Sequence, residues 1–280
     1  MLEHTFIHLP GVGEKTESRL WERGFLHWDD VIGQEDPPFS RAKKGLALSA
    51  LEESRKRLAQ RDCDYFAQRL PAGEHWRLFP DFGDKVGYLD IETTGLGNGS
   101  GDHITTIALY DGQTVRTYVH GRNLEDFEDD IRECSLLVTF NGKCFDIPFI
   151  ERQMRIKLPV AHIDLRFVLK ALGMKGGLKS CEKQFGLDRD ELDGVDGYFA
   201  VLLWQEFENT GNENVLETLL AYNAADVIGL EVLLHHALAA KFRDTPFGPD
   251  YPVSIPEPVA NPHTPDVELV RQMKLLHYGL

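Results

Sequence analysis

The stretch Tyr88-Leu89-Asp90-Ile91-Glu92 decides the fold and indicates the chemistry. Its apolar residues predict a buried β-strand, and side chains alternate across a strand. Asp90 and Glu92 therefore share one face, while Leu89 and Ile91 share the other. Two neighbouring carboxylates on a buried strand repel each other and resist desolvation. A folded protein tolerates this arrangement mainly when a cation lies between them, so the strand predicts a metal site.

Around this strand, the hydrophobic pattern predicts an α/β domain over about residues 85–242. Asp111-Gly112 predicts a hairpin between two of its strands. Helices and further strands follow, so we expect a mixed β-sheet flanked by helices. The expected strands are Val86–Ile91, His103–Tyr110, Thr114–His120, Leu136–Phe140 and Val160–Ile163, and a helix is expected over Asn123–Cys134 with Asn123 as its cap.

Two later segments supply further acids. Asp146 follows a buried strand that ends at Asn141-Gly142, and a helix is expected to start near it. Tyr222 and Asp226 are spaced i, i+4 in an apolar helix, so they share one helix face. Taken alone, Asp146 would also suit a helix cap, and Asp226 would suit a surface acid beside a tyrosine.

Together, Asp90, Glu92, Asp146, Tyr222 and Asp226 resemble the site of the DEDD superfamily of 3′–5′ exonucleases, in its tyrosine-bearing DEDDy subclass. Residues 89–96, 141–146 and 222–226 match its three motifs, and the resemblance covers about residues 85–240. Within the superfamily the chain is most similar to the predicted exonucleases of the YprB type, through residues 162–165 and 178–187. This resemblance implies a ribonuclease-H-like fold.

The resemblance also implies two divalent metal ions, and hard oxygen ligands favour Mg²⁺ or Mn²⁺. Asp90, Glu92 and Asp226 would hold metal directly, and Asp146 largely through water. Tyr222 would orient the attacking water, because an unperturbed phenol pKa of about 10 suits a base poorly near neutral pH. Asp164 is expected to be structural rather than a ligand. The terminal nucleotide would meet Thr93, Thr94, Gly95, Leu96 and Asn141.

The N-terminal stretch Leu9-Pro10-Gly11-Val12-Gly13-Glu14-Lys15-Thr16 resembles the hairpin of helix-hairpin-helix modules. In that family the glycines expose backbone N–H groups to a phosphate beside a helix N-terminus. We therefore expect Gly11 and Gly13 to bind DNA. A role in packing or protein contact stays open, since the local charge is acidic.

A basic helix is expected over Arg41–Arg61, where seven basic residues stand against two acids. Its face is either simply solvated or in contact with phosphates, through Lys43, Lys44, Arg55 and Lys56.

Seven of the 14 prolines fall between Pro246 and Pro265, which excludes regular helix or central strand there. Four units are expected: a helix-hairpin-helix-like unit (1–33), a linker with the basic helix (34–84), the exonuclease domain (85–242) and a Pro-rich tail (243–280).

The formal net charge of −15 argues against a general nucleic-acid binder, but a metal-holding hydrolase needs clustered carboxylates. The four cysteines form no C-x-x-C pair, so a thiolate zinc site or a disulfide framework is not expected. With no apolar run or signal peptide, a cytoplasmic location without a membrane partner is expected. Protein partners are not indicated.

These features favour a metal-dependent 3′–5′ exonuclease acting on nucleic acid, with DNA favoured over RNA because of the hairpin. The alternatives are an exoribonuclease or structure-specific endonuclease using the same site, and a phosphohydrolase of small phosphates. A catalytically silent nucleic-acid-binding protein on the same fold is the alternative of another class.

Overall fold

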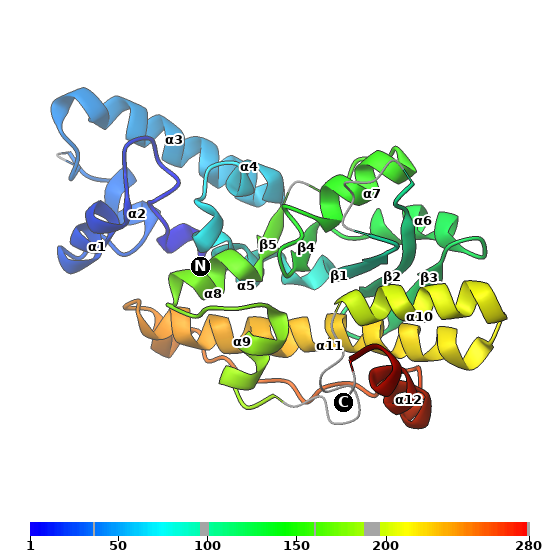
Figure 1. Ribbon diagram of the computed structural model, residues 1–280. Helices are drawn as coiled ribbons and strands as arrows, with labels where there is room; N and C mark the ends of the chain where they lie inside the picture. Colours follow the sequence, from blue (N-terminus) through cyan, green and yellow to red (C-terminus); the bar gives the residue numbers. More distant parts are fainter. Residues whose placement is uncertain (36, 96–100, 160, 188–196, 279–280) are drawn as a thin grey trace.

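The computed structural model describes residues 1–35, 37–95, 101–159, 161–187 and 197–278 (Figure 1). Helices are labelled α, and 3-10 helices η. They are η1 (Leu2–His4), α1 (Glu14–Glu22), α2 (Trp28–Ile32), α3 (Arg41–Ala59), α4 (Cys63–Ala67), η2 (Ala72–Leu78), α5 (Phe79–Phe82), η3 (Gly83–Lys85), η4 (Leu124–Asp126), α6 (Phe127–Ile131), α7 (Asp146–Met154), α8 (Leu165–Ala171), α9 (Leu178–Gln184), α10 (Gly197–Thr210), α11 (Glu213–Arg243), η6 (Gly248–Asp250) and α12 (Val267–Tyr278).

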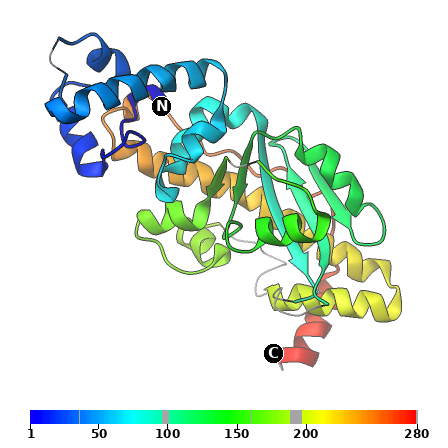
Figure 2. The same cartoon turned by 90° about the horizontal axis from the view of Figure 1, so that it is seen from above.

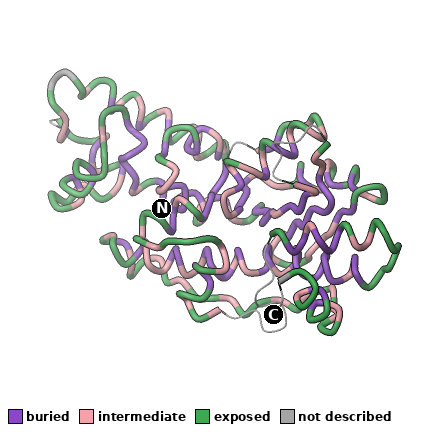
Figure 3. Tube along the Cα trace, in the orientation of Figure 1, coloured by how far each residue is buried: buried purple, intermediate pink, exposed green. Residues whose placement is uncertain are grey.

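The five-stranded sheet has the order β3-β2-β1-β4-β5. Its strands are β1 (Val86–Thr93), β2 (Ile104–Tyr110), β3 (Val115–Val119), β4 (Leu136–Thr139) and β5 (His162–Asp164). The β1–β2 and β2–β3 pairs are antiparallel, and β4 and β5 continue the sheet in parallel with β1. The expected mixed α/β sheet is confirmed, with β1 at its centre, and its strands are largely buried (Figure 3).

Helices cover both faces of the sheet, with α11 on one face and α6 and α7 on the other (Figures 1 and 2). Because side chains alternate along β1, successive residues face opposite helical layers of the sheet. Tyr88 lies in a core cluster with Leu230 of α11. Leu89 lies in a second cluster with Phe149 of α7. Asp90 and Glu92 follow the alternation of Tyr88, so they face α11.

A buried ion-pair network ties the N-terminal helices to the sheet domain. Glu17 of α1 accepts hydrogen bonds from the backbone N–H groups of Phe6 and Ile7 at 2.6 and 2.9 Å. Its other oxygen lies 2.8 Å from the Arg77 guanidinium. Arg77 also binds Glu74, which pairs with Lys241 of α11 at 2.8 Å. This network therefore joins α1 to α11 through charges that are largely shielded from water.

Asn123 is the N-cap residue of η4, as expected, but its side chain makes no cap hydrogen bond. The Asn123 carboxamide accepts from the Val119 N–H at 2.8 Å and donates to the Thr117 carbonyl at 3.1 Å. It closes the turn after β3, which illustrates how such side chains compete with helix capping. The helical segment is accordingly split into η4 and a short α6 that ends at Ile131.

The proline-rich tail runs across the molecule without regular structure between Tyr251 and Asp266, as expected. Its Asn261 amide donates to the Ala221 carbonyl of α11 at 2.8 Å. The His263 ring lies 3.0 Å from both Thr117 of β3 and Glu217 of α11. The tail thus links α11 to the edge strand of the sheet.

The helix α12, which the sequence patterns did not predict, follows the last proline. Its Val270 and Met273 lie in a buried cluster with Trp204 of α10. In the part of the chain that the structure describes, no helix is both long and apolar enough to cross a membrane.

Removal of Arg77 should strongly destabilise the fold. Arg77→Met leaves the Glu17 and Glu74 carboxylates, both under 8% exposed, without their shared cation. Breaking such a buried pair costs about 3–5 kcal/mol. Urea unfolding measures the loss, and Arg122→Met, whose bridge to Glu213 is exposed, is the matched control. A loss for Arg77→Met no larger than that of the control would contradict this role.

Candidate functional site

Three carboxylates converge between β1 and α11. One oxygen of each of Asp90, Glu92 and Asp226 lies within 4.8 Å of the others. Glu92 and Asp226 are 8% and 5% exposed and Asp90 is half-buried, so water screens this cluster only in part. The period of the strand brings Asp90 and Glu92 to the same face, and α11 supplies the third acid from across that face.

Asp146 is the fourth acid beside this cluster. It is the first residue of α7, directly after the loop that follows β4, and its carboxylate accepts from the Ile91 N–H at 3.2 Å. Ile91 lies between Asp90 and Glu92 in β1, which brings the Asp146 carboxyl group to the same strand. Burial raises the pKa of Asp146 to about 7, against the lowering effect of hydrogen bonds from its own N–H and that of Ile91.

The cluster is electrostatically unfavourable without a cation. Burial raises the pKa of Asp90 well above its usual value, and the charges of Asp226, Asp146 and Glu92 add to the rise. A divalent cation would relieve both effects, because it replaces water and neutralises the mutual repulsion. All donors are hard carboxylate oxygens, which Mg²⁺ and Mn²⁺ prefer. Asp90, Glu92 and Asp226 are therefore the residues that fit a metal.

Asn223 orients Asp90, a function that the sequence patterns did not reveal. The Asn223 side-chain amide donates to the Asp90 Oδ2 at 2.7 Å. The Thr106 hydroxyl donates to the Asn223 Oδ1 at 3.0 Å, which fixes the orientation of the amide. Asn223 is fully buried, and its donation opposes the rise in the Asp90 pKa. The place of Asn223 between Tyr222 and Asp226 is the only signal that the sequence offers.

Tyr222 lies one helical turn before Asp226 on α11 and is 4% exposed. Its ring belongs to the buried cluster that contains Trp204 of α10 and Val270 of α12. The Lys179 ammonium of α9 lies 4.4 Å from the centre of the ring. Tyr222 is thus held on the same helix face as Asp226, as the i, i+4 spacing predicted.

The residues expected to meet a nucleotide surround the end of β1. The Thr93 hydroxyl donates to the Gly95 carbonyl at 2.6 Å. Thr94 and His103 are joined by two hydrogen bonds of 3.0 Å. The Thr94 N–H donates to the His103 carbonyl, and the His103 N–H donates to the Thr94 Oγ1. A Cβ at Gly95 would approach the Asp102 carboxylate to 2.7 Å, so a side chain at this position would displace that carboxylate. Leu96 lies outside the described residues.

Asn141 has a left-handed backbone, with φ +69°, at the turn after β4. Its N–H donates to Asp164 at 2.8 Å, and its Oδ1 accepts from the Arg166 guanidinium. Asp164 accepts two further backbone N–H bonds, from Lys143 and Arg166, each at 3.1 Å. These bonds give Asp164 the structural position that the sequence led us to expect.

The N-terminal candidates are not brought to the carboxylates. Gly11 and Gly13 are exposed at the hairpin before α1, and Figure 1 shows α1–α3 at one end of the molecule, beyond the sheet. The Lys43 ammonium lies 3.5 Å from the Gly11 carbonyl, and that of Lys44 lies 2.6 Å from the Glu35 carbonyl. Arg55 pairs with Asp29, which neutralises part of the basic face. Lys56 is exposed.

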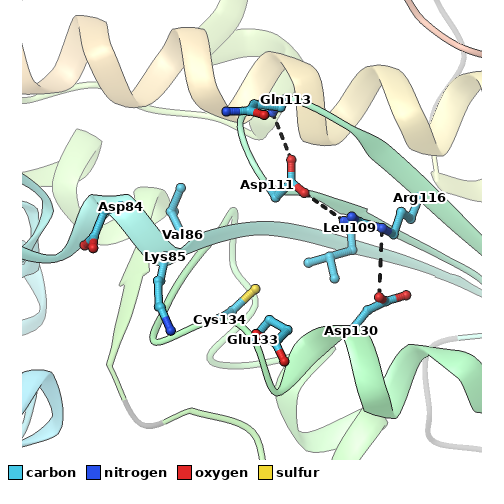
Figure 4. A pocket seen from close by; sticks show the side chains of 10 residues that line it. All are labelled: Asp84, Lys85, Val86, Leu109, Asp111, Gln113, Arg116, Asp130, Glu133 and Cys134. Carbon is cyan, nitrogen blue, oxygen red and sulfur yellow. Dashed lines mark hydrogen bonds and ion pairs between the residues drawn. The ribbon is translucent and has the colours of Figure 1, made fainter.

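A polar pocket of about 330 Å³ lies at the opposite end of β1 from the carboxylates (Figure 4). Its charged groups bind one another: Arg116 lies 2.8 Å from Asp111 and 3.9 Å from Asp130. This pocket is therefore separate from the carboxylate cluster. It is lined by Asp84, Lys85, Val86, Leu109, Asp111, Gln113, Arg116, Asp130, Glu133 and Cys134.

The sequence profile of a family described as the RNase_H superfamily matches residues 87–238, which include the carboxylates and Tyr222. A protein of Bacillus subtilis (strain 168), "Uncharacterized protein YprB", is 30% identical over 170 residues. That match covers 53% of this chain and 41% of the relative, so the chain spans less than half of the relative's length. The family B DNA polymerase from the hyperthermophilic archaeon Pyrobaculum calidifontis aligns with a TM-score of 0.36 and 14% identity, over 56% of this chain and 29% of the polymerase.

Without metal, the carboxylate cluster should weaken the fold as the pH rises. The pKa of Asp146 is raised to about 7 in the folded protein, against about 3.9 for an unfolded aspartate. The folded state therefore holds its proton more tightly, and that stabilisation is lost as the pH rises from about 4 through about 7. In chelator, the free energy of unfolding of the wild type relative to Asp146→Asn should fall over this range, as measured by urea unfolding.

Excess Mg²⁺ should offset this loss at about pH 8, because a cation then replaces the protons. The electrostatics assigned to this cluster would be contradicted if the difference in free energy of unfolding between the wild type and Asp146→Asn did not change with pH. The same holds if Mg²⁺ did not affect the stability of the wild type.

Loss of the Asn223 amide should weaken metal binding. In Asn223→Leu the Asp90 carboxylate loses the donor that orients it, and losing such a partner costs about 10–100-fold in metal affinity. The readout is the Mg²⁺ concentration at which the melting temperature has risen by half of its maximal shift. Thr106→Val, which keeps the amide but frees its rotation, should raise this concentration less. A purely structural role would lower the melting temperature and leave that concentration unchanged.

Proposed function

The chain belongs to the RNase H superfamily, and from this membership and the carboxylate cluster we propose that it is a metal-dependent 3′–5′ exonuclease of the DEDDy type. Its substrate would be DNA, as single strands or 3′ ends. The convergence of Asp90, Glu92 and Asp226 within 4.8 Å carries this proposal. The superfamily includes nucleases, and a buried cluster of acids is the kind of site with which such enzymes hold divalent metals.

In the proposed reaction, the phosphodiester bond is hydrolysed between phosphorus and the 3′ oxygen of the preceding nucleotide. Two bound divalent ions, Mg²⁺ or Mn²⁺, would supply an activated water and neutralise charge on the phosphate. Asp90, Glu92 and Asp226 would hold the metals directly, and Asp146 through water. Asn223 keeps one Asp90 oxygen occupied by a single amide donor and leaves the other oxygen available for a cation.

Tyr222 is assigned to orient the attacking water rather than to remove its proton. Its ring belongs to a buried cluster with residues of α10 and α12, and the Lys179 ammonium of α9 lies 4.4 Å from its centre, so the ring is held in place. A fixed donor of this kind contributes by positioning a reactant. We assign contacts with the terminal nucleotide to Thr93, Thr94, Gly95 and Asn141, at the ends of β1 and β4, and extend the assignment to Leu96 from its motif.

The first 33 residues are proposed to act as a helix-hairpin-helix-like unit that binds the DNA backbone. Gly11 and Gly13 are exposed, and Gly11 has a φ of +73° that favours glycine. The buried pair of Glu17 and Arg77 would hold this unit at a fixed position relative to the active site. Residues 34–84 would then connect it to the catalytic domain (85–242), and residues 243–280 would form the tail.

A timed digestion of 5′-labelled single-stranded DNA tests this proposal. With Mg²⁺ or Mn²⁺, the wild type should give a ladder that shortens from the 3′ end, and chelator should abolish it. Asp226→Asn should give no ladder because the cluster loses a metal ligand. Asp129→Asn is the matched control, since this aspartate is 88% exposed on α6.

Retained cleavage in Asp226→Asn would contradict the assignment of the site. Absence of cleavage by the wild type in either metal, with strand binding preserved, would instead favour the silent binding protein. Labelled RNA in the same assay distinguishes an exoribonuclease, and internal cuts on a branched duplex would identify an endonuclease.

A further inference from the structure

A second basic segment lies beside the carboxylate cluster. Residues 165–187 contain five basic residues and one acid in a chain whose net charge is −15. They form α8, the following turn and α9. We call the exposed side of this segment the α8–α9 surface; the five basic residues of the segment are Arg166, Lys170, Lys175, Lys179 and Lys183.

Four of the five basic side chains of this segment face solvent, whereas the Lys179 ammonium is buried. Arg166, Lys170, Lys175 and Lys183 are exposed, whereas the one acid, Glu182, is 3% exposed. Within the described residues, neither Lys170 nor Lys175 forms an ion pair with a carboxylate. Glu182 is thus withdrawn from the surface, whereas Lys170 and Lys175 stay exposed on it and present their positive charges to solvent.

The helix α3 shows the opposite arrangement, although its sequence is equally basic. Arg55 pairs with Asp29, Arg57 with Glu53 and Asp62, and Arg61 with Asp84. Carboxylates therefore neutralise Arg55 and Arg57 on α3 and Arg61 just after its end. Exposed charges that are already paired contribute less to the attraction of a phosphate. The α8–α9 surface is consequently the better candidate for contact with a polyanion.

This surface adjoins the candidate active site at two points. The Arg166 guanidinium donates to Asn141, in the turn between β4 and Asp146. The Lys179 ammonium lies 4.4 Å from the Tyr222 ring on α11. Figure 1 shows α8 and α9 beside α11, between the N-terminal helices and the central strands. A strand that crosses this surface would therefore reach the carboxylates directly.

The turn between the two helices holds Lys175 in place. Gly173 and Gly176 have φ values of +83° and +105°, which favour glycine at both positions. The Lys175 carbonyl accepts from the Ser180 hydroxyl at 3.3 Å and from the Gln184 amide at 3.1 Å. The backbone of Lys175 is thus tied to α9, so its ammonium extends from an ordered turn.

We propose that the phosphate backbone of a nucleic-acid strand crosses the α8–α9 surface on its way to the carboxylate cluster. This inference rests on the proposed function, since it takes that cluster as the site of cleavage. An acidic protein with a cluster of carboxylates repels a phosphate chain. A basic surface next to the cluster overcomes this repulsion and releases counterions from the strand.

Strand binding measured against salt concentration tests this surface. The parent protein is the full chain with Asp226→Asn, in Mg²⁺, and fluorescence anisotropy of a labelled single-stranded DNA oligonucleotide reports binding. Each phosphate contact on a single strand contributes about 0.7 to the slope of log K against log salt concentration. Lys170→Gln with Lys175→Gln should therefore reduce the magnitude of the slope by about 1.4 and weaken binding several-fold at low salt.

Lys85→Gln with Lys157→Gln is the matched control, because it removes two exposed lysines outside this surface. Its slope should equal that of the parent. Equal slopes for both pairs, or no binding by the parent at low salt, would overturn the proposal. The measurement does not depend on cleavage, so a failure of the exonuclease proposal in the digestion assay remains distinguishable from a failure here.

A third pair, Lys43→Gln with Lys56→Gln, tests the rival surface on α3. If this pair reduces the slope while Lys170→Gln with Lys175→Gln leaves it unchanged, the strand lies along α3 and the proposal is wrong.

Discussion

Mutual repulsion among buried carboxylates is the constraint on which the rest of the structure depends. Asp90, Glu92 and Asp226 lie within 4.8 Å of one another, and Asp146 reaches the same strand. Burial and neighbouring charge raise the pKa of Asp90 well above its ordinary value. Such a cluster persists only where the elements that carry it are held firmly from elsewhere. A central strand and a 31-residue helix carry it here.

Contacts outside the cluster hold α11 at two positions. Toward its C-terminal end, Lys241 joins the buried network of Glu74 and Arg77. Closer to Tyr222, Asn261 of the tail binds the Ala221 carbonyl. Between these points, Asn223 connects the helix to Asp90 in β1. The N-terminal unit and the tail therefore both fix the helix that carries Asp226, which is how a metal site is kept preorganised.

Local periodicity explains what the sequence predicts well. The alternation in β1 places Asp90 and Glu92 together, and the i, i+4 spacing places Tyr222 with Asp226. Features that depend on distant partners are not visible in this way. Asn223 is an ordinary helical residue until Thr106 and Asp90 lie beside it, and Arg55 looks available for phosphate until Asp29 pairs with it. For the same reason the sequence indicates α3 as the candidate for contact with phosphates, whereas the α8–α9 surface becomes a candidate only once the fold is known.

A crystal of the full chain grown with Mn²⁺ tests directly whether the carboxylate cluster holds a divalent metal ion, because anomalous scattering locates this ion without reference to activity. We expect a Mn²⁺ peak bound by oxygens of Asp90, Glu92 and Asp226, with the Asn223 amide still donating to Asp90. A cluster without a peak at saturating Mn²⁺, with its carboxyl groups hydrogen-bonded to one another through shared protons, would contradict this expectation.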